Sequence, residues 1–570
     1  MPPSSCGGLG RATIAVALIV TAAPGCGDGE EERFRPVPVV PGVGEVLTGR
    51  YDNARTGAYG AETLLTPKSA SALTLSRKLT LDGELYAQPL VLESEGRALV
   101  MAATMEDSVL AFDADSGEIA WRVGEQRELG TPAFSKRNVG GNNGIMATPV
   151  IDGTTRALYV VSRDCDPQFP PEAPHCVFHL SRIHADSGAL EEQVEIQGSV
   201  RFANGSTVQF EPSVQWNRPA LLLAEGELFV AFGSGPNGDL HEEDFVYHGW
   251  VFRYDVGDLA SAPDVMCTTP AGRGGSVWQG GAGPAANDEF VYFAGANGIL
   301  SNSVHPPADF PAEPMGQEDS VFKLPIHAPF PAPGEAIPQY ADTRPYRADG
   351  NVFQYMETGD VGFGSSGPTL LAEANRLLIG SKPALVYLLD AGDLSPAREP
   401  MSPFSELSLQ PDHSLYLHGW WDIPPIYGSF VFFRPRASDG SLAHYGFAYA
   451  WPSKDRLASF RYDYDSDTFE LERTSDLPAL EGGGNLVLTS NDGDEESAVL
   501  WALTRAPKQA SPAGTLWAID PRTLAVIASW SIPAWSKFTP PTVVGGRVYV
   551  PSTSNEPGTK QQLLMFGLPR

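Results

Sequence analysis

Short apolar runs separated by turn residues follow one another along almost the whole chain. The clearest case is SVLAFDADSGEIAWRV (108–123), where apolar runs at 109–112 and 119–123 flank a turn at 115–117. The glycine of that turn supplies the positive φ that a tight reversal needs. The pattern predicts two antiparallel strands joined by a hairpin turn.

This pattern recurs through the sequence, which indicates a repeat architecture. Followed from copy to copy, the residue that ends the first strand falls at positions 113, 184, 255, 323, 390, 463, 520 and 567, about 65 residues apart on average. Between these copies a proline opens a second kind of apolar run, at QPLVL (88–92), TPVID (148–152), RPALLL (218–223), GPAAND (283–288), GPTLL (367–371), PPIYG (424–428) and TPPTVV (539–544). An eighth opening, GGNLVL near Gly483, has no proline. Proline at the first residue of a strand costs no ladder hydrogen bond.

Eight units of three or four short strands predict an all-β fold, a single eight-bladed β-propeller of four-stranded antiparallel blades over residues 45–570. A β-sandwich also alternates strands with turns, but repetition at a fixed period favours the propeller. The last unit ends without an outermost strand, whereas ALTLSRKLTL (72–81) is a strand without a unit. We expect residues 72–81 to join the last blade and close the ring.

The composition agrees with a folded chain that is rich in turns. Glycine and proline account for 59 and 50 of the 570 residues, and 42% of the residues are hydrophobic, which argues against a helical bundle. Acidic residues outnumber basic ones by 69 to 39, which gives a net charge of −30. Because nucleic-acid backbones repel such a surface, we do not expect nucleic acids as partners.

Residues 1–26 predict an export signal, because a basic residue precedes an apolar run too short to cross a membrane. The run ends Ala-Pro-Gly-Cys and resembles a bacterial lipoprotein signal, in which Cys26 would become the lipidated N-terminus. Ala23 stands where that signal usually has leucine. Residues 27–44 predict a flexible tether. The expected location is the bacterial cell envelope, in the periplasm or on the outer membrane; secretion without a lipid is the alternative.

The cysteines are consistent with an oxidising compartment. Cys165 and Cys176 bracket the proline-rich segment DPQFPPEAPH and predict a disulfide, with two reduced loop thiols as the alternative. Cys267 is expected to be buried. No Cys-x-x-Cys motif occurs, which excludes a zinc ribbon and a c-type haem.

Five segments resemble the quinoprotein-like (PQQ-repeat) propellers: YAQPLVLE, SVLAFDADSGEIAW, TPVID, LWAID and TPPTVVGGRVYV. That superfamily includes PQQ-dependent alcohol dehydrogenases and outer-membrane assembly lipoproteins. YDNARTGAYGAETLLTP (51–67), YHGWVFRYD (247–255) and GRGGSVWQGGAGPAA (272–286) resemble a secreted bacterial subgroup described as PQQ-repeat proteins. The dehydrogenase resemblance implies PQQ with Ca²⁺ at the axis, the quinone lying between a tryptophan and a disulfide of adjacent cysteines. This sequence has no adjacent cysteines, and none of its motifs matches the calcium ligands.

Residues just before the strand-opening prolines are expected at the inner rim, where loops build a pocket. The candidates for binding a planar anionic ligand are Arg218, Trp250, Arg273, Trp278, Gln279 and Lys537. Arginine binds carboxylates through two hydrogen bonds, and tryptophan stacks on flat rings. Asp360 and His248 are the candidates for a catalytic base that accepts the proton of a substrate alcohol. The alternative is structural, with arginines that satisfy backbone groups and tryptophans that pack between blades.

Three functions are consistent with these features. The first is an exported, lipid-anchored propeller that binds a small ligand or a protein partner at its axial face. The second is a PQQ-dependent oxidoreductase that oxidises an alcohol or sugar and passes electrons to a separate carrier, since the chain has no haem motif. The third is an envelope protein-assembly scaffold. No P-loop, His-Glu-x-x-His or Gly-x-Ser-x-Gly motif occurs, so hydrolytic chemistry has no support.

Overall fold

The computed structural model describes residues 44–135, 141–170, 175–201, 205–234, 246–270, 272–296, 320–332, 339–340, 363–382, 384–404, 424–437, 439–506, 513–554, 556 and 558–569. The predicted export signal with Cys26 and nearly all of the predicted tether lie outside these residues, as does the candidate base Asp360. Within the described ranges, no helix is long and apolar enough to cross a membrane.

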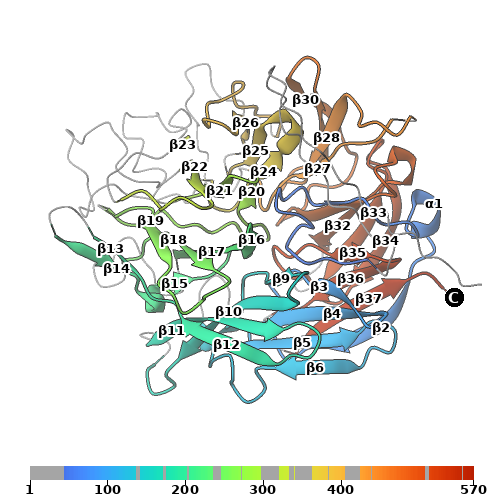
Figure 1. The fold of residues 1–570 in the computed structure, drawn as a ribbon. Helices are drawn as coiled ribbons and strands as arrows, with labels where there is room; N and C mark the ends of the chain where they lie inside the picture. Colours follow the sequence, from blue (N-terminus) through green and yellow to red (C-terminus); the bar gives the residue numbers. More distant parts are fainter. Residues whose placement is uncertain are drawn as a thin grey trace, which may run out of the picture. The chain divides into compact units, whose positions relative to one another are not determined.

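Eight small antiparallel sheets form an eight-bladed β-propeller, which confirms the predicted fold. The sheets follow one another in chain order (Figure 1). From the innermost strand outward, they are blade I, β3 (Leu90–Ser94), β4 (Arg97–Thr104), β5 (Ser108–Asp113) and β6 (Ile119–Val123); blade II, β9 (Val150–Asp152), β10 (Ala157–Cys165), β11 (Cys176–His184) and β12 (Leu190–Glu195); blade III, β16 (Leu222–Ala224), β17 (Glu227–Ser234), β18 (Trp250–Asp255) and β19 (Asp264–Cys267); blade IV, β20 (Ala285–Ala286), β21 (Phe290–Ala294), β22 (Val321–Pro325) and β23 (Gln339–Tyr340); blade V, β24 (Thr369–Leu371), β25 (Arg376–Gly380) and β26 (Val386–Asp390); blade VI, β27 (Val431–Phe433), β28 (Tyr445–Ala450), β29 (Ala458–Asp463) and β30 (Thr468–Thr474); blade VII, β31 (Gly484–Thr489), β32 (Val499–Arg505), β33 (Gly514–Ile519) and β34 (Val526–Ile532); and blade VIII, β35 (Thr542–Val544), β36 (Arg547–Ser552), β37 (Gln562–Gly567) and β2 (Thr74–Thr80).

Shorter elements lie between the blades. They are β1 (Ala58–Tyr59), which runs parallel to β31, the helix α1 (Pro67–Ala70), the pair β7 (Ala133–Ser135) and β8 (Gly141–Asn143), the pair β13 (Ser199–Arg201) and β14 (Thr207–Gln209), and β15 (Gln215–Trp216), which pairs with β17.

The sequence repeat marks the third strand of each blade. In β5, the side chain of Asp113 accepts hydrogen bonds from the backbone N–H groups of Asp115 and Ser116 at 2.9 and 2.8 Å. Such a side-chain-to-backbone turn reverses the chain directly after the strand. The recurring position is the last residue of the third strand at Asp113, His184, Asp255, Asp390, Asp463 and Gly567.

Blades V and VI depart from the prediction. Blade V has three strands among the described residues instead of four, and isolated bridges from Pro396 and Met401 to β26 lie where a fourth strand would pair. In blade VI the innermost strand begins at Val431, after the predicted opening at 424–428. Consecutive prolines provide no N–H for a ladder, and the N–H of Gly428 donates instead to the segment before blade V.

The N-terminal strand closes the ring, as predicted. β2 pairs with β37 in antiparallel register, with Leu79 opposite Leu563, and so becomes the outermost strand of blade VIII. Leu79 is 3% exposed and belongs to the same apolar cluster as Leu563, whereas Leu75 of the same strand is 42% exposed. The first and last parts of the propeller sequence are therefore held in one sheet.

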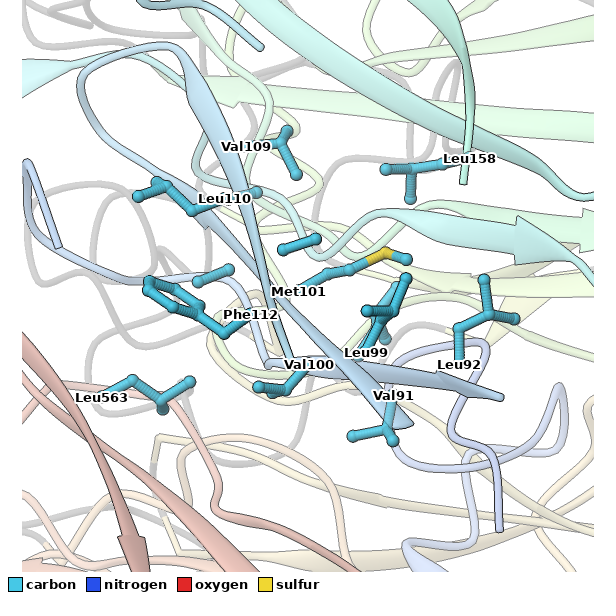
Figure 2. Packing of buried hydrophobic residues seen from close by; sticks show 14 of the residues in the cluster. Val91, Leu92, Leu99, Val100, Met101, Val109, Leu110, Phe112, Leu158 and Leu563 are labelled. Carbon is cyan, nitrogen blue, oxygen red and sulfur yellow. The ribbon is translucent and has the colours of Figure 1, made fainter. Parts of the chain in front are cut away.

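Apolar side chains fill the spaces between adjacent blades. Figure 2 shows Leu99 and Met101 of β4 in a cluster that also contains Leu158 of blade II and Leu563 of blade VIII. Since β4 is covered on both faces, seven of its eight residues are buried, and its sequence reads as one continuous apolar run.

Residues 46–57, called here the hub segment, hydrogen-bond with the innermost part of every blade. Backbone groups of the segment meet blades I, II, V, VI and VII, through Val91, Ile151, Leu370, Phe432 and Leu488. Asn53 forms hydrogen bonds with Leu223 of blade III and Ala286 of blade IV. The Tyr51 hydroxyl accepts a hydrogen bond from the N–H of Val543 in blade VIII. A segment that contacts all eight innermost strands must lie at the axis, so the hub segment fills the centre of the ring there.

Two buried arginines of the hub segment bind carbonyl groups that converge on the axis. Arg55 is 0% exposed, and its Nε and Nη2 donate to the carbonyls of Pro284 and Leu221 at 2.8 and 2.9 Å. Arg50 donates from Nη1 and Nη2 to the carbonyls of Leu486 and Phe430 at 3.2 and 2.6 Å. The two guanidinium groups therefore join blades III, IV, VI and VII.

We predict that the closing strand contributes a large part of the stability. Replacing Leu79 by alanine removes buried packing between blades I and VIII and should lower the free energy of unfolding by about 2–5 kcal/mol. Leu75→Ala, on the exposed side of the same strand, should cost less than about 1 kcal/mol. Urea denaturation followed by tryptophan fluorescence measures both; equal losses would refute this role of β2.

Candidate functional site

We call the residues that directly precede the innermost strand of a blade its approach segment. Phe538, in the approach segment of blade VIII, lies where several of these segments meet. The Phe538 ring centroid is 5.1 Å from that of Tyr427, before blade VI, and 5.6 Å from the guanidinium carbon of Arg218, before blade III. A Cβ on Gly281, before blade IV, would lie 1.8 Å from the Phe538 carbonyl oxygen. Four approach segments thus contact one another around Phe538.

Arg218 is a buried cation between two aromatic rings. Its guanidinium carbon is 5.1 Å from the Tyr86 ring centroid on one side and 5.6 Å from that of Phe538 on the other, and the residue is 2% exposed. Burial lowers the pKa of the Arg218 guanidinium to about 10, so it is still charged at neutral pH. Its Nε and Nη2 atoms have no hydrogen-bond partner among the described residues.

Arg273 and Gln279, on the approach segment of blade IV, are buried and unpaired in the same way. Arg273 is 2% exposed, and again Nε and Nη2 lack a partner within the described ranges. Gln279 is 0% exposed, and both polar atoms of its side chain are unpaired there. A buried polar group without a partner costs about 1–3 kcal/mol. The unpaired side chains of Arg218 and Gln279, on two neighbouring segments, indicate a site for a missing hydrogen-bonding ligand.

The unpaired atoms of the two arginines belong to the edge that recognises carboxylates. Nε and Nη2 lie on one side of the guanidinium plane and can donate two parallel hydrogen bonds to the oxygens of one carboxylate. In the hub segment, by contrast, Arg55 uses this same edge for backbone carbonyls. Arg50 and Arg55 therefore have the structural role of satisfying backbone carbonyls. In Arg218 and Arg273 the Nε–Nη2 edge has no partner among the described residues.

The two candidate tryptophans lie in different surroundings. The half-buried Trp278 packs against Trp216, with ring centroids 5.4 Å apart, in a cluster that includes Tyr86, Met105 and Met146. This places Trp278 beside the ring that covers Arg218. Trp250 is 0% exposed in β18 and belongs to the apolar core between blades II and III. Its position agrees with the packing alternative.

His248 and Lys537 complete the described candidates. His248 is half-buried, and its Nδ1 lies 3.1 Å from the carbonyl oxygen of Thr269. Burial lowers the pKa of the His248 imidazole to about 4, so the ring is neutral at pH 7. Lys537 is exposed, with Nζ 4.7 Å from the ring centroid of the adjacent Phe538. The geometry brings Arg218, Trp278, Gln279 and Lys537 to one region; His248 and Arg273 lie earlier along the approach to blade IV.

Sequence reasoning missed Glu84 and Tyr86, which belong to the approach segment of blade I. Tyr86 covers Arg218, and its hydroxyl is hydrogen-bonded to the carboxyl of Glu84. Burial raises the pKa of Glu84 to about 7, against the lowering effect of this hydrogen bond. Glu84 and Tyr86 lie shortly before the strand-opening Pro89, so the position criterion that identified the other candidates could have found them.

The overall arrangement is similar to that of solved dehydrogenases. The quinohemoprotein alcohol dehydrogenase ADHIIG from Pseudomonas putida HK5 aligns with 92% of this chain and 80% of its own, at 13% identity and a TM-score of 0.56. The quinohemoprotein alcohol dehydrogenase from Comamonas testosteroni aligns over the same shares at 12% identity and a TM-score of 0.55. A europium-containing methanol dehydrogenase aligns with 93% of this chain and 99% of its own, at 11% identity and a TM-score of 0.53.

The chain thus shares the eight-bladed propeller fold of these solved dehydrogenases. The likeness establishes the fold and leaves the activity open, because function depends on the site. The sequence matches no family model and no curated protein.

The quinoprotein fold raises the question whether PQQ and Ca²⁺ fit these residues. The unpaired arginine edges, Gln279 and the flat ring of Trp278 fit a planar, carboxylated quinone. For the cation, no group of three His, Cys, Asp or Glu side chains with metal-binding geometry lies in the part of the chain that the structure describes. The described residues therefore fit the anionic ring and supply no calcium cage.

The cysteines do not contribute to the site. Cys165 and Cys176 form a disulfide that joins the ends of β10 and β11 in blade II. Cys267 is buried in β19, and burial raises the pKa of its thiol to about 12. The disulfide thus staples the β10–β11 hairpin of blade II.

We predict a pH-dependent stability penalty from Glu84. Its folded-state pKa of about 7 exceeds the ordinary 4.5, so the folded protein binds more protons between these values and loses stability as the pH rises through them. Glu84→Gln removes the penalty and should raise the free energy of unfolding by roughly 1–3 kcal/mol at pH 8, with little change near pH 4.5. Urea denaturation at the two pH values measures this; an equal effect at both would contradict it.

Proposed function

We propose that this protein binds a small, planar, carboxylated ligand among its approach segments. The observation that carries the proposal is the unused carboxylate-binding edge of Arg218, which is buried, charged and flanked by aromatic rings. A carboxylate there would accept two charge-assisted hydrogen bonds in surroundings that exclude water. Arg273 offers a second edge of the same kind, and Gln279 offers both a donor and an acceptor.

Aromatic side chains favour a flat ligand over a flexible one. Tyr86, Trp278 and Trp216 form one cluster with Met105 and Met146 beside the guanidinium of Arg218. Flat rings stack on such side chains with offset or edge contacts, and thioethers adapt to the remaining shape. A carboxylated quinone such as PQQ combines both features, and it is therefore the first ligand to test.

A PQQ-dependent dehydrogenase is the alternative that this site also supports. Bound PQQ would accept one hydride equivalent, that is two electrons and a proton, from an alcohol or sugar, and a separate carrier would reoxidise it. The neutral imidazole of His248 could take the hydroxyl proton, although its lowered pKa makes it a weak base. Asp360, outside the described residues, stays a candidate for the same role.

The binding prediction is tested with PQQ, with and without Ca²⁺. Isothermal titration should give a saturable signal for the wild type, and Arg218→Gln should weaken binding by about 100-fold, because truncating one partner of a buried charged pair costs several kcal/mol. Arg473→Gln, at an exposed position of β30, is the matched control and should bind as the wild type does. Equal affinity of all three proteins would refute the role of Arg218. A dye-linked alcohol oxidation assay on the same samples decides the enzymatic alternative.

We further propose that the propeller is exported and attached to a membrane by a lipid on Cys26. Cys26→Ser should move the protein from the membrane fraction to the soluble fraction of the cells that produce it. Cys6→Ser, in the same N-terminal segment, is the control and should leave the distribution unchanged. Unchanged partitioning of the Cys26 variant would overturn the lipid anchor. The interpretation as an envelope assembly scaffold stays a prediction.

A further inference from the structure

The carboxylate-binding edges are closed off from solvent in this structure. Arg218 and Arg273 are each 2% exposed, and Gln279 is 0% exposed. An anion from solution cannot form two hydrogen bonds with a guanidinium edge that water does not reach. Some part of the surroundings must therefore move before a ligand can bind.

The turn at 535–539 places the Phe538 ring over one side of the Arg218 guanidinium. Phe538 is 6% exposed and faces the guanidinium of Arg218, whereas the adjacent Lys537 is exposed. Both flanks of the turn are held: Ser536 Oγ lies 2.7 Å from Thr553 Oγ1, and Thr539 Oγ1 donates to the carbonyl of Tyr86 at 3.2 Å. Only the tip of the turn, residues 537–538, lies between these anchors.

The backbone at this contact is strained. Phe538 has φ +66 and Gln279 has φ +36, values that favour glycine over residues with a side chain. Such a conformation costs about 1–3 kcal/mol and persists only where the surroundings enforce it. Gly281 permits this conformation, because the Phe538 carbonyl occupies the space that a Cβ at Gly281 would need. Phe538 is therefore strained at its contact with Gly281, and Gln279 is strained two residues before that contact, so an alternative conformation is expected there.

We propose that Phe538 is the gate of the ligand site. In the closed state described here its ring covers the Arg218 guanidinium; in the open state the tip of the turn releases its left-handed backbone and the ring moves aside to admit the ligand. The identity of the ligand rests on the proposed function, whereas the covering of Arg218 by Phe538 does not depend on it.

Chemical labelling of the arginines tests the gate without any ligand. Phenylglyoxal reacts with accessible guanidinium groups, and peptide mass spectrometry gives the labelling rate of each arginine. Arg218 should react slowly in the wild type and at least tenfold faster in Phe538→Gly, which removes the ring and permits the positive φ. Arg55, which is held by backbone carbonyls, should stay unlabelled in both proteins and so reports that the fold is intact.

Two further variants make the result specific. Gly281→Ala forces the Phe538 carbonyl to move and should also raise the Arg218 rate, with the ring still present. Leu524→Gly is the matched control, since Leu524 is also buried (3% exposed) and has a positive φ of +60, but lies in the blade VII hairpin. It should leave the Arg218 rate unchanged. An Arg218 rate within twofold of the wild type in both Phe538→Gly and Gly281→Ala would overturn the gate.

PQQ binding kinetics then separate this proposal from the proposed function. If both hold, stopped-flow measurements should show faster association in Phe538→Gly than in the wild type. If PQQ binds to neither protein while the labelling rates differ as expected, the gate stands and the proposed ligand is wrong. If PQQ binds to the wild type while labelling and association rates are unchanged by the variants, the ligand stands and the gate is wrong.

Discussion

A closed ring of sheets directs the backbone of every innermost strand toward one axis, and those polar groups must be paired there. In this propeller the hub segment, residues 46–57, provides the pairing. It hydrogen-bonds with all eight blades. Arg50 and Arg55 donate hydrogen bonds to backbone carbonyls that converge from four of them. Together with β2 in the last blade, this makes the N-terminal part of the domain the element that holds the ring closed.

Within one molecule, buried arginines therefore serve two purposes. Those of the hub segment use their N–H groups for backbone carbonyls and are fully accounted for by the fold. Arg218 and Arg273 are as deeply buried but leave the carboxylate-binding edge unpaired among the described residues. Since desolvating a charge without partners is unfavourable, this second pair is better explained by a ligand than by stability. The strain at Phe538 and Gln279 lies in the same region.

The repeat made most of the fold predictable. Each blade places its third strand before a polar turn and opens its first strand near a proline, so both patterns could be read from local residue types. The hub segment could not, because residues 46–57 occur once and form hydrogen bonds only with strands distant in the sequence. For the site, position before a proline identified Arg218 and Gln279, while Trp250, which was chosen from an aromatic-rich run beside a glycine, lies in the core. The proposed gate at Phe538 depends on the positive φ of that residue, which cannot be predicted from a phenylalanine in the sequence.

The most direct test of this account compares the two classes of arginine by the free energy of unfolding. Arg55→Met roughly keeps the side-chain volume and removes four hydrogen bonds of 2.6–2.9 Å. It should lower the free energy of unfolding, measured by urea denaturation, by at least about 3 kcal/mol. Methionine at position 218 removes a buried charge without hydrogen-bond partners among the described residues, and it should leave the stability unchanged or raise it. Equal losses in the two variants would contradict the claim that Arg218 is reserved for a ligand.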